Sequence, residues 1–386
     1  MDLRENNFHF LLLSRALRSV SLSFATVASP LVLYYSGLSP VLVGVVLAIS
    51  LAFTAALSIA LGLLGDYRGY RKSLFVSDLV SGLGCLLIGL GNPWPTTPIG
   101  VVLAGLSGGA GAPRGAFSPG TTALVSVNWK KERERVARLG LLISVASISS
   151  ILGNLLFTLV SSLSDELTFM RLAYLFSSAL LFLSAFLVLK VEEKGKAVKK
   201  SKVITKKSAS YLLRVVASNA VNGFGIGLSV PILPLWLKLV GHLTDQEIGT
   251  AFTLSSVLSA VGSLVAPRVR GDPVLIGGLT RSLGGVLLIL TALFPNLALS
   301  LVSLRGFVIG VGAPNRSTAN IRGYSEEDYG AASSLQGIAT RLTQTSSTLS
   351  GYLMEVSPEL PLGVGGSLQA IAGVVYVILL RKSVTS

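Results

Sequence analysis

Residues 41–91 read VLVGVVLAISLAFTAALSIALGLLGDYRGYRKSLFVSDLVSGLGCLLIGLG. Two long apolar runs enclose a short basic loop, Gly65–Lys72. Roughly 20 apolar residues are what an α-helix needs to cross the hydrocarbon core of a bilayer. Helices are the expected form, because backbone polar groups in lipid must be satisfied within the segment. The stretch therefore predicts two transmembrane helices joined by a loop at one membrane surface.

The whole chain shares this composition. Of its 386 residues, 51% are hydrophobic and 13% are charged, whereas a soluble domain has about 25% charged residues. The formal net charge of +14 lies mostly in short clusters between apolar runs, unlike the water-facing basic surface of a nucleic-acid-binding domain. The composition argues against a soluble enzyme, a disordered regulator and a nucleic-acid partner. It predicts a multi-pass membrane protein.

Twelve spans of this kind can be placed along the chain, and no soluble domain fits between them. They cover about 8–35, 41–64, 73–91, 99–126, 137–161, 168–189, 209–237, 247–267, 274–294, 297–321, 330–354 and 361–380. The predicted fold class is therefore an all-α polytopic membrane protein with twelve transmembrane helices.

The charges of the connecting loops alternate with the spans. Lys238 is the only Lys or Arg in the odd-numbered connections, whereas the even-numbered ones are basic and include eight lysines in Lys190–Lys207. Because cytoplasmic loops are enriched in Lys and Arg, both termini are expected in the cytoplasm. The predicted organisation is a six-helix bundle over 1–189, a basic cytoplasmic linker over 190–208 and a second six-helix bundle over 209–386.

The two halves also share sequence features. Residues 109–114 (GAGAPR) in the fourth span resemble residues 310–316 (GVGAPNR) in the tenth, about 201 residues later. The same offset relates Pro30 to Pro231. Repetition after an even number of spans predicts two pseudo-symmetric halves of parallel orientation.

The basic loop after the second span contains a recognisable motif. Residues 62–72 read GLLGDYRGYRK and resemble the G-x-L-a-D-r-x-G-r-r/k motif of the major facilitator superfamily. Gly62, Leu64, Asp66, Gly69 and Arg71 match, whereas Tyr67 and Tyr70 replace the usual basic residues. The resemblance implies a transporter with rocker-switch alternating access. It also implies a cytoplasmic gate of Gly62, Asp66, Gly69 and Arg71, in which Asp66 holds the two halves together in the outward-facing state.

The residue types of this loop also suggest local structural roles that do not depend on the resemblance. Gly69 suits a tight turn, and Gly62 allows close approach of a neighbouring helix. Asp66 lies at a helix end, where it can pair with a basic residue or face another helix N-terminus. A loop whose charges only reach the membrane interface is the alternative.

Polar residues within the spans give the candidate ligand site, since an ionisable group at bilayer depth is costly. The resemblance implies that the first, fourth, seventh and tenth helices line a central cavity. The substrate-binding candidates on these helices are Arg18, Arg114, Asn222, Arg305 and Arg316. Several arginines favour an organic or phosphorylated anion as substrate, although Arg114 could instead be satisfied by carbonyls freed at Pro113 and Pro119.

Asp78 is the only carboxylate clearly inside a span. It is a candidate for ion coupling, and the alternative is a pair with a cytoplasmic basic residue. With one cysteine and two histidines, no disulfide within the chain and no metal or cofactor site are expected.

The favoured function is secondary transport of a small solute, with or without a coupling ion, by a monomer in the plasma membrane. Multidrug or metabolite efflux is the alternative of the same fold, although the fifth span lacks the Gly-Pro motif of the drug and proton antiporters. A non-transporting receptor or assembly protein is the alternative of another class. An enzyme is not expected, because embedded carboxylates and histidines are scarce.

Overall fold

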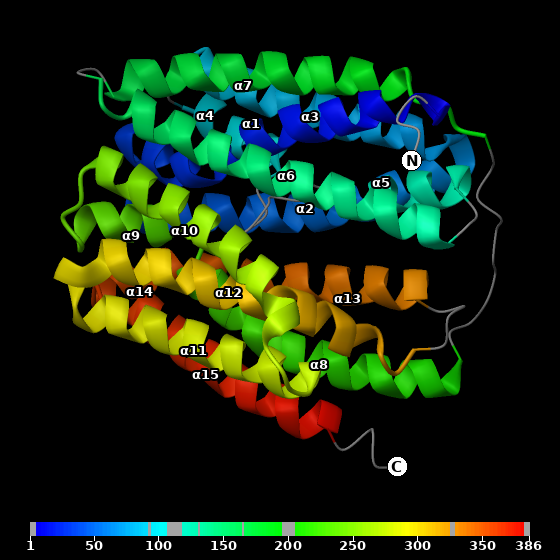
Figure 1. Ribbon diagram of the computed structural model, residues 1–386. Helices are drawn as coiled ribbons and strands as arrows, with labels where there is room; N and C mark the ends of the chain where they lie inside the picture. The colour runs from blue at the N-terminus through cyan, green and yellow to red at the C-terminus, as the bar shows by residue number, and fades with distance from the viewer. Residues whose placement is uncertain are drawn as a thin grey trace. The chain divides into compact units, whose positions relative to one another are not determined.

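The computed structural model describes residues 5–91, 94–105, 118–129, 132–163, 166–194, 205–324 and 329–381. Within these ranges the secondary structure is helical and contains no strand (Figure 1). The first half contains α1 (Phe8–Tyr35), α2 (Pro40–Arg68), α3 (Tyr70–Gly89), α4 (Thr96–Ala104), α5 (Ser118–Asn128), α6 (Glu132–Val160) and α7 (Glu166–Leu189). The second half contains α8 (Lys206–Ser229), α9 (Leu233–Leu239), α10 (Asp245–Val265), α11 (Pro273–Leu293), α12 (Ala298–Ile321), α13 (Tyr329–Thr343), α14 (Ser347–Val356) and α15 (Leu360–Arg381).

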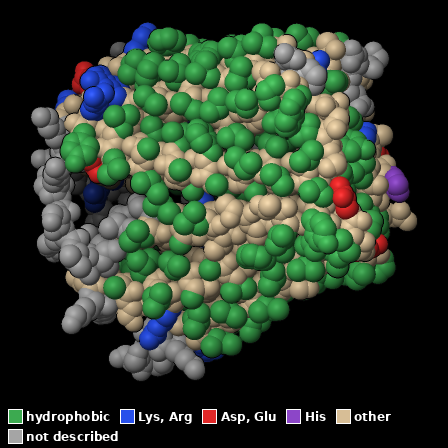
Figure 2. All heavy atoms as spheres, turned by 180° about the vertical axis from the view of Figure 1, so that it is seen from behind, with side chains coloured by type: hydrophobic (Ala, Val, Ile, Leu, Met, Phe, Trp, Pro, Cys, Tyr) green, Lys and Arg blue, Asp and Glu red, His purple; other side chains and the backbone are tan. Residues whose placement is uncertain are grey.

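The all-α membrane fold is confirmed. Among the described residues, 10 helical segments are long and apolar enough to cross a membrane, and each coincides with a predicted span. Hydrophobic side chains cover much of the face drawn in Figure 2, as expected for surfaces in contact with lipid. In the fourth predicted span the structure describes α4 and α5 only. Arg114 and the 109–114 motif lie outside the described residues.

Two of the predicted spans are interrupted. In the seventh, α8 ends at Ser229 and α9 begins at Leu233, because Pro231 lacks an amide hydrogen for the helical ladder. In the eleventh, a short 3₁₀ segment, Gln344–Ser346, separates α13 from α14. Pro30, by contrast, lies inside the continuous helix α1, so the two aligned prolines have different local consequences.

The chain forms two compact units. The first is built from α1, α3 to α7 and most of α2, and the second from α8 to α15 together with Leu38–Ala48. In the first unit, α1 packs on α6 and α7, while α3 packs on α4 and α7. In the second, α8 packs on α13 and α15, while α11 packs on α12 and α15. Corresponding helices therefore have corresponding neighbours, which supports the internal repeat.

Candidate functional site

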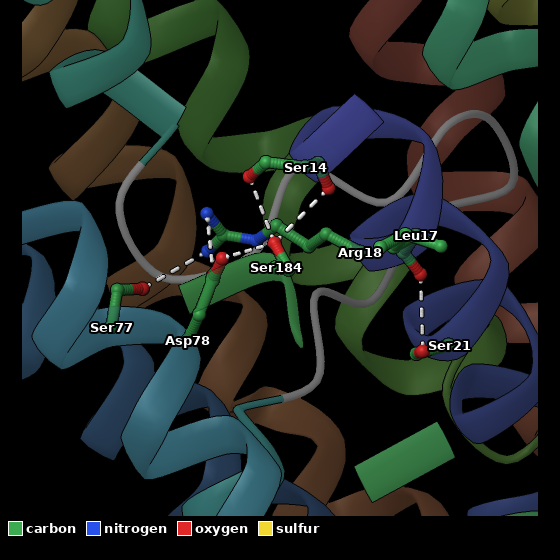
Figure 3. A network of polar contacts seen from close by, with 7 residues as sticks. All are labelled: Ser14, Leu17, Arg18, Ser21, Ser77, Asp78 and Ser184. Carbon is green, nitrogen blue, oxygen red and sulfur yellow. Dashed lines mark hydrogen bonds and ion pairs between the residues drawn. The ribbon is translucent and has the colours of Figure 1, made fainter. Parts of the chain in front are cut away.

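A buried ion pair joins α1 to α3 in the first unit (Figure 3). Arg18 Nη1 lies 3.1 Å from Asp78 Oδ1, and the two side chains are 4% and 1% exposed. Arg18 Nη2 also donates to Ser77 Oγ at 3.0 Å. Ser184 on α7 donates to Asp78 Oδ2 at 2.6 Å. The carboxylate is thus held by the three helices that pack together in this unit.

The ion pair shows how these two charges are stabilised within the predicted spans. A charge at bilayer depth is costly unless it is paired and hydrogen-bonded, and Arg18 and Asp78 meet that need for each other. Asp78 does pair with a basic residue, which lies inside α1 rather than in a loop. A role in ion coupling is compatible with this pair and stays a prediction. Arg18 therefore has an internal anionic partner.

A small cavity lies beside this pair. It is lined by Leu11, Ser14, Arg15, Arg18, Leu74, Thr121 and Val188, and it leaves about 10 Å³ for the centre of a water molecule, close to the lower limit for one water. Arg15 is buried and interacts electrostatically with Asp78. Two arginines therefore line the cavity, and both act on the Asp78 carboxylate.

Arg15 and Ser184 were not among the predicted site residues. The i, i+3 spacing places Arg15 on the same face of α1 as Arg18, but its position within two turns of the cytoplasmic surface also fitted a side chain that only reaches the membrane interface. No pattern in the sequence singles out Ser184 among the serines of α7.

Arg305 of α12 is enclosed by neutral partners in the second unit. Its Nε donates to the carbonyl of Gly284 on α11 at 3.2 Å, and its Nη2 donates to Gln369 Oε1 on α15 at 3.1 Å. Gln369 in turn donates to Ser229 Oγ on α8 at 3.0 Å. Arg305 is 5% exposed, so a full positive charge is buried among carbonyl, amide and hydroxyl dipoles.

Arg281 of α11, a further candidate within the ninth predicted span, is a second buried cation. Its Nη2 donates to Asn219 Oδ1 on α8 at 2.8 Å, and its guanidinium carbon lies 4.6 Å from the centre of the Tyr376 ring. The side chain is 8% exposed, and its Nη1 has no hydrogen-bond partner among the described residues. Its position inside the ninth apolar span is the feature of the sequence that makes Arg281 a candidate.

Arg316 of α12 lies close to Arg281. Arg316 Nη1 donates to Thr280 Oγ1 at 3.4 Å, and Thr280 is the chain neighbour of Arg281. Within the described residues, no carboxylate lies within ion-pair distance of Arg281, Arg305 or Arg316. Arg316 is partly exposed. Asn222 of α8 is also partly exposed, and no contact in the described structure joins it to these arginines.

The loop between α2 and α3 is fixed by the segment that follows α7. Gly69 has a φ of +98°, a conformation that favours glycine. The backbone amides of Tyr70 and Arg71 donate to the two carboxylate oxygens of Glu193 at 2.9 and 3.1 Å. Arg71 Nη1 donates to the carbonyls of Leu189 and Val191, both at 3.2 Å. The Glu193 carboxylate thus caps the N-terminus of α3.

The surroundings of Asp66 and Gly62 differ from those expected from the motif. Asp66 Oδ1 accepts a hydrogen bond from the Tyr70 hydroxyl at 2.6 Å, so Tyr70, where the motif usually has a basic residue, contacts the acidic residue directly. A Cβ added at Gly62 would meet no atom within 4 Å. The close helix approach that Gly62 would allow is therefore not seen among the described residues.

Comparison with known proteins identifies the family. A family model described as "Major Facilitator Superfamily" matches residues 11–219, more than half of the chain. The chain belongs to the major facilitator superfamily. A comparison with curated proteins gave no significant match.

Solved structures of transporters have the same fold. A POT family transporter, PepTSo, is 9% identical with a TM-score of 0.75, and the match covers 100% of this chain and 99% of that one. A D-xylose-proton symporter is 13% identical with a TM-score of 0.72, covering 95% and 96%. A bacterial homologue of the human lysosomal transporter Spinster is 13% identical with a TM-score of 0.67, covering 100% and 96%. At these identities the likeness concerns the fold.

Proposed function

We propose that this superfamily member carries a small organic or phosphorylated anion by rocker-switch alternating access, as a monomer in the plasma membrane with both termini in the cytoplasm. One observation supports the charge of the solute above all. Arg281, Arg305 and Arg316 of the second unit have no carboxylate within ion-pair distance among the described residues.

The contrast with the first unit strengthens this argument. There the buried Arg18 is neutralised by Asp78 at 3.1 Å. An uncompensated buried charge costs several kcal/mol, and dipoles of neutral groups recover only part of that cost. An anionic ligand would compensate the positive charge of the second unit and would be concentrated there by its electrostatic potential.

Asp66 and Asp78 are assigned separate roles in the proposed cycle. Asp66, with Gly62, Gly69 and Arg71, belongs to the cytoplasmic gate. Asp78 is the proposed coupling residue and would carry a proton. The charged groups that act on its carboxylate are Arg18 and Arg15 of α1, and Ser184 of α7 hydrogen-bonds to it. Protonation would neutralise Asp78 and release Arg18 from its internal partner.

Solute flux in liposomes containing the purified protein tests the proposal. The probes are succinate, glycerol 3-phosphate, glucose and the lipophilic cation tetraphenylphosphonium. Uptake of an anion, reduced at least about tenfold in Arg305→Gln, is expected, because a hydrogen bond from a charged group contributes about 1.5–3 kcal/mol. Arg322→Gln, which removes only an exposed pair with Asp272, is the control.

The same assay separates the alternatives and the two acidic residues. Transport of tetraphenylphosphonium alone would support multidrug efflux, and no flux of any solute would support a receptor. Asp66→Asn is expected to slow anion uptake. Asp78→Asn is expected to remove the pH dependence of that uptake. Uptake by Asp78→Asn that still follows pH as the wild type does would contradict the coupling role.

A further inference from the structure

The buried polar pairs of the two units occupy corresponding positions. Arg18 lies twelve residues before Pro30, and Asn219 lies twelve residues before the aligned Pro231. Asp78 is the ninth residue of α3, which begins at Tyr70, and Arg281 is the ninth residue of α11, which begins at Pro273. In each unit these two residues contact each other.

The third member of each set also corresponds. Ser184 lies five residues before the end of α7 and Tyr376 lies five residues before the end of α15. Ser184 donates to Asp78, and the Tyr376 ring lies under Arg281. The first, third and sixth membrane spans of each half, which are α1, α3 and α7 and then α8, α11 and α15, therefore supply equivalent contacts. The two sets of residues differ in their chemistry.

The difference is a missing carboxylate. In the first unit a guanidinium and a carboxylate neutralise each other, whereas in the second an amide faces a guanidinium. Arg281 Nη1 is left buried without a hydrogen-bond partner in the described structure. The neighbouring charge of Arg316 repels that of Arg281, so the second set needs negative charge that the described residues do not supply.

We propose that Arg281 and Arg316 form an anion subsite for a small dicarboxylate, in which one ligand carboxylate does for Arg281 what the Asp78 carboxylate does for Arg18. The second carboxylate faces Arg316, whose partly exposed side chain gives access to the subsite. The inference rests on the proposed anion transport and narrows its substrate. Guanidinium groups bind carboxylates through two parallel hydrogen bonds, and Nη1 of Arg281 is the donor still available.

Binding of matched ligands to the full-length protein in detergent tests the subsite. The probes are succinate, its monoanionic half-amide succinamate and the neutral diamide succinamide, with glycerol 3-phosphate as the phosphorylated anion. Titration calorimetry is expected to give the order succinate, succinamate, succinamide, because the three differ in charge while remaining similar in size. Arg281→Gln is expected to weaken succinate binding at least about tenfold, whereas the control Arg322→Gln binds succinate as the wild type does.

A second variant tests the idea without removing the buried charge. Asn219→Asp places a carboxylate where Asn219 Oδ1 now lies, 2.8 Å from Arg281 Nη2. This internal carboxylate would recreate the charge pairing of the first unit. The melting temperature without ligand is expected to rise, and succinate binding is expected to weaken at least about tenfold. Arg281→Lys keeps the positive charge but cannot donate two parallel hydrogen bonds to one carboxylate. It replaces Arg281→Gln in the binding test if Arg281→Gln does not fold.

Several results would overturn the proposal. Succinate binding unchanged in Arg281→Lys and Asn219→Asp would remove the subsite, even if an anion is still transported. Equal binding of succinamide and succinate, or binding of glycerol 3-phosphate alone, would refute the dicarboxylate assignment. The absence of binding and flux for every anion would refute the proposed function itself, and the two failures are therefore distinguishable.

Discussion

Arg18 and Asp78 show how two costly residues become one stable element of the core. Each charge alone at bilayer depth would be strongly unfavourable, and the pair is further satisfied by Ser77 and Ser184. Such a pair adds little net stability compared with apolar residues, but losing one member leaves the other charge uncompensated. The energetics of the site therefore belong to the pair and not to either residue.

Single substitutions in this pair are expected to be more damaging than the double substitution. Asp78→Asn and Arg18→Gln should each lower the free energy of unfolding by about 3–5 kcal/mol, since each leaves a buried charge unpaired. The double variant should be less destabilised than the sum of the two. Thermal melting of the detergent-purified proteins measures this. Ser77→Ala, which removes one hydrogen bond to Arg18, is the mild control at about 1 kcal/mol.

Strict additivity of the two substitutions would contradict this account. It would mean that Arg18 and Asp78 are stabilised separately by their surroundings. The sequence identified both residues as functional candidates, but it could not predict that they pair. That knowledge needs the rotation of α1 against α3, which is set by side-chain packing and not by hydropathy.

Helices α10 and α12 pack through small residues. A Cβ at Gly306 or Gly310 of α12 would collide with the backbone carbonyl of Ser255 or Ser259 of α10. Gly262 of α10 likewise faces the backbone of α12 at Phe307. The four-residue spacing of Gly306 and Gly310 is the arrangement that lets transmembrane helices approach closely. Sequence repetition drew attention to Gly310 but not to this interface, because the partner face of α10 cannot be predicted from composition.

Gly306→Val is therefore expected to destabilise the second unit by more than about 2 kcal/mol, because well-packed cores tolerate added methyl groups poorly. Thermal melting measures the effect. Gly337→Ala on α13, where an added Cβ would meet nothing within 4 Å, is the matched control. It should melt at or above the wild-type temperature, since Ala favours helix over Gly by up to about 1 kcal/mol. Equal melting temperatures for Gly306→Val and the wild type would refute the packing.

At the scale of the whole molecule, hydropathy and loop charge predicted most of the helices. Ten of the predicted spans coincide with helical segments of the described structure that are long and apolar enough to cross a membrane, because the length of an apolar run reflects the thickness of the bilayer. The sequence did not predict the break between α13 and α14, since Gln344–Ser346 has no proline or glycine to indicate it. The correspondence of Arg281 with Asp78 could not be predicted either, because it is visible only when the helices of both units are compared.

Membrane orientation is the remaining prediction at this scale, and it rests on loop charge alone. The loop Gly65–Lys72 is basic and expected inside, whereas the loop before α10 is expected outside. Cys85, the only cysteine, is fully buried. In a Cys85→Ser variant, a single introduced cysteine therefore shows on which side of the membrane its position lies. Gln246→Cys at the start of α10 is exposed and should react with an impermeant maleimide in intact cells. Tyr67→Cys, at a position 71% exposed, should react only after permeabilisation. The reverse pattern would place both termini outside, since each crossing inverts the side.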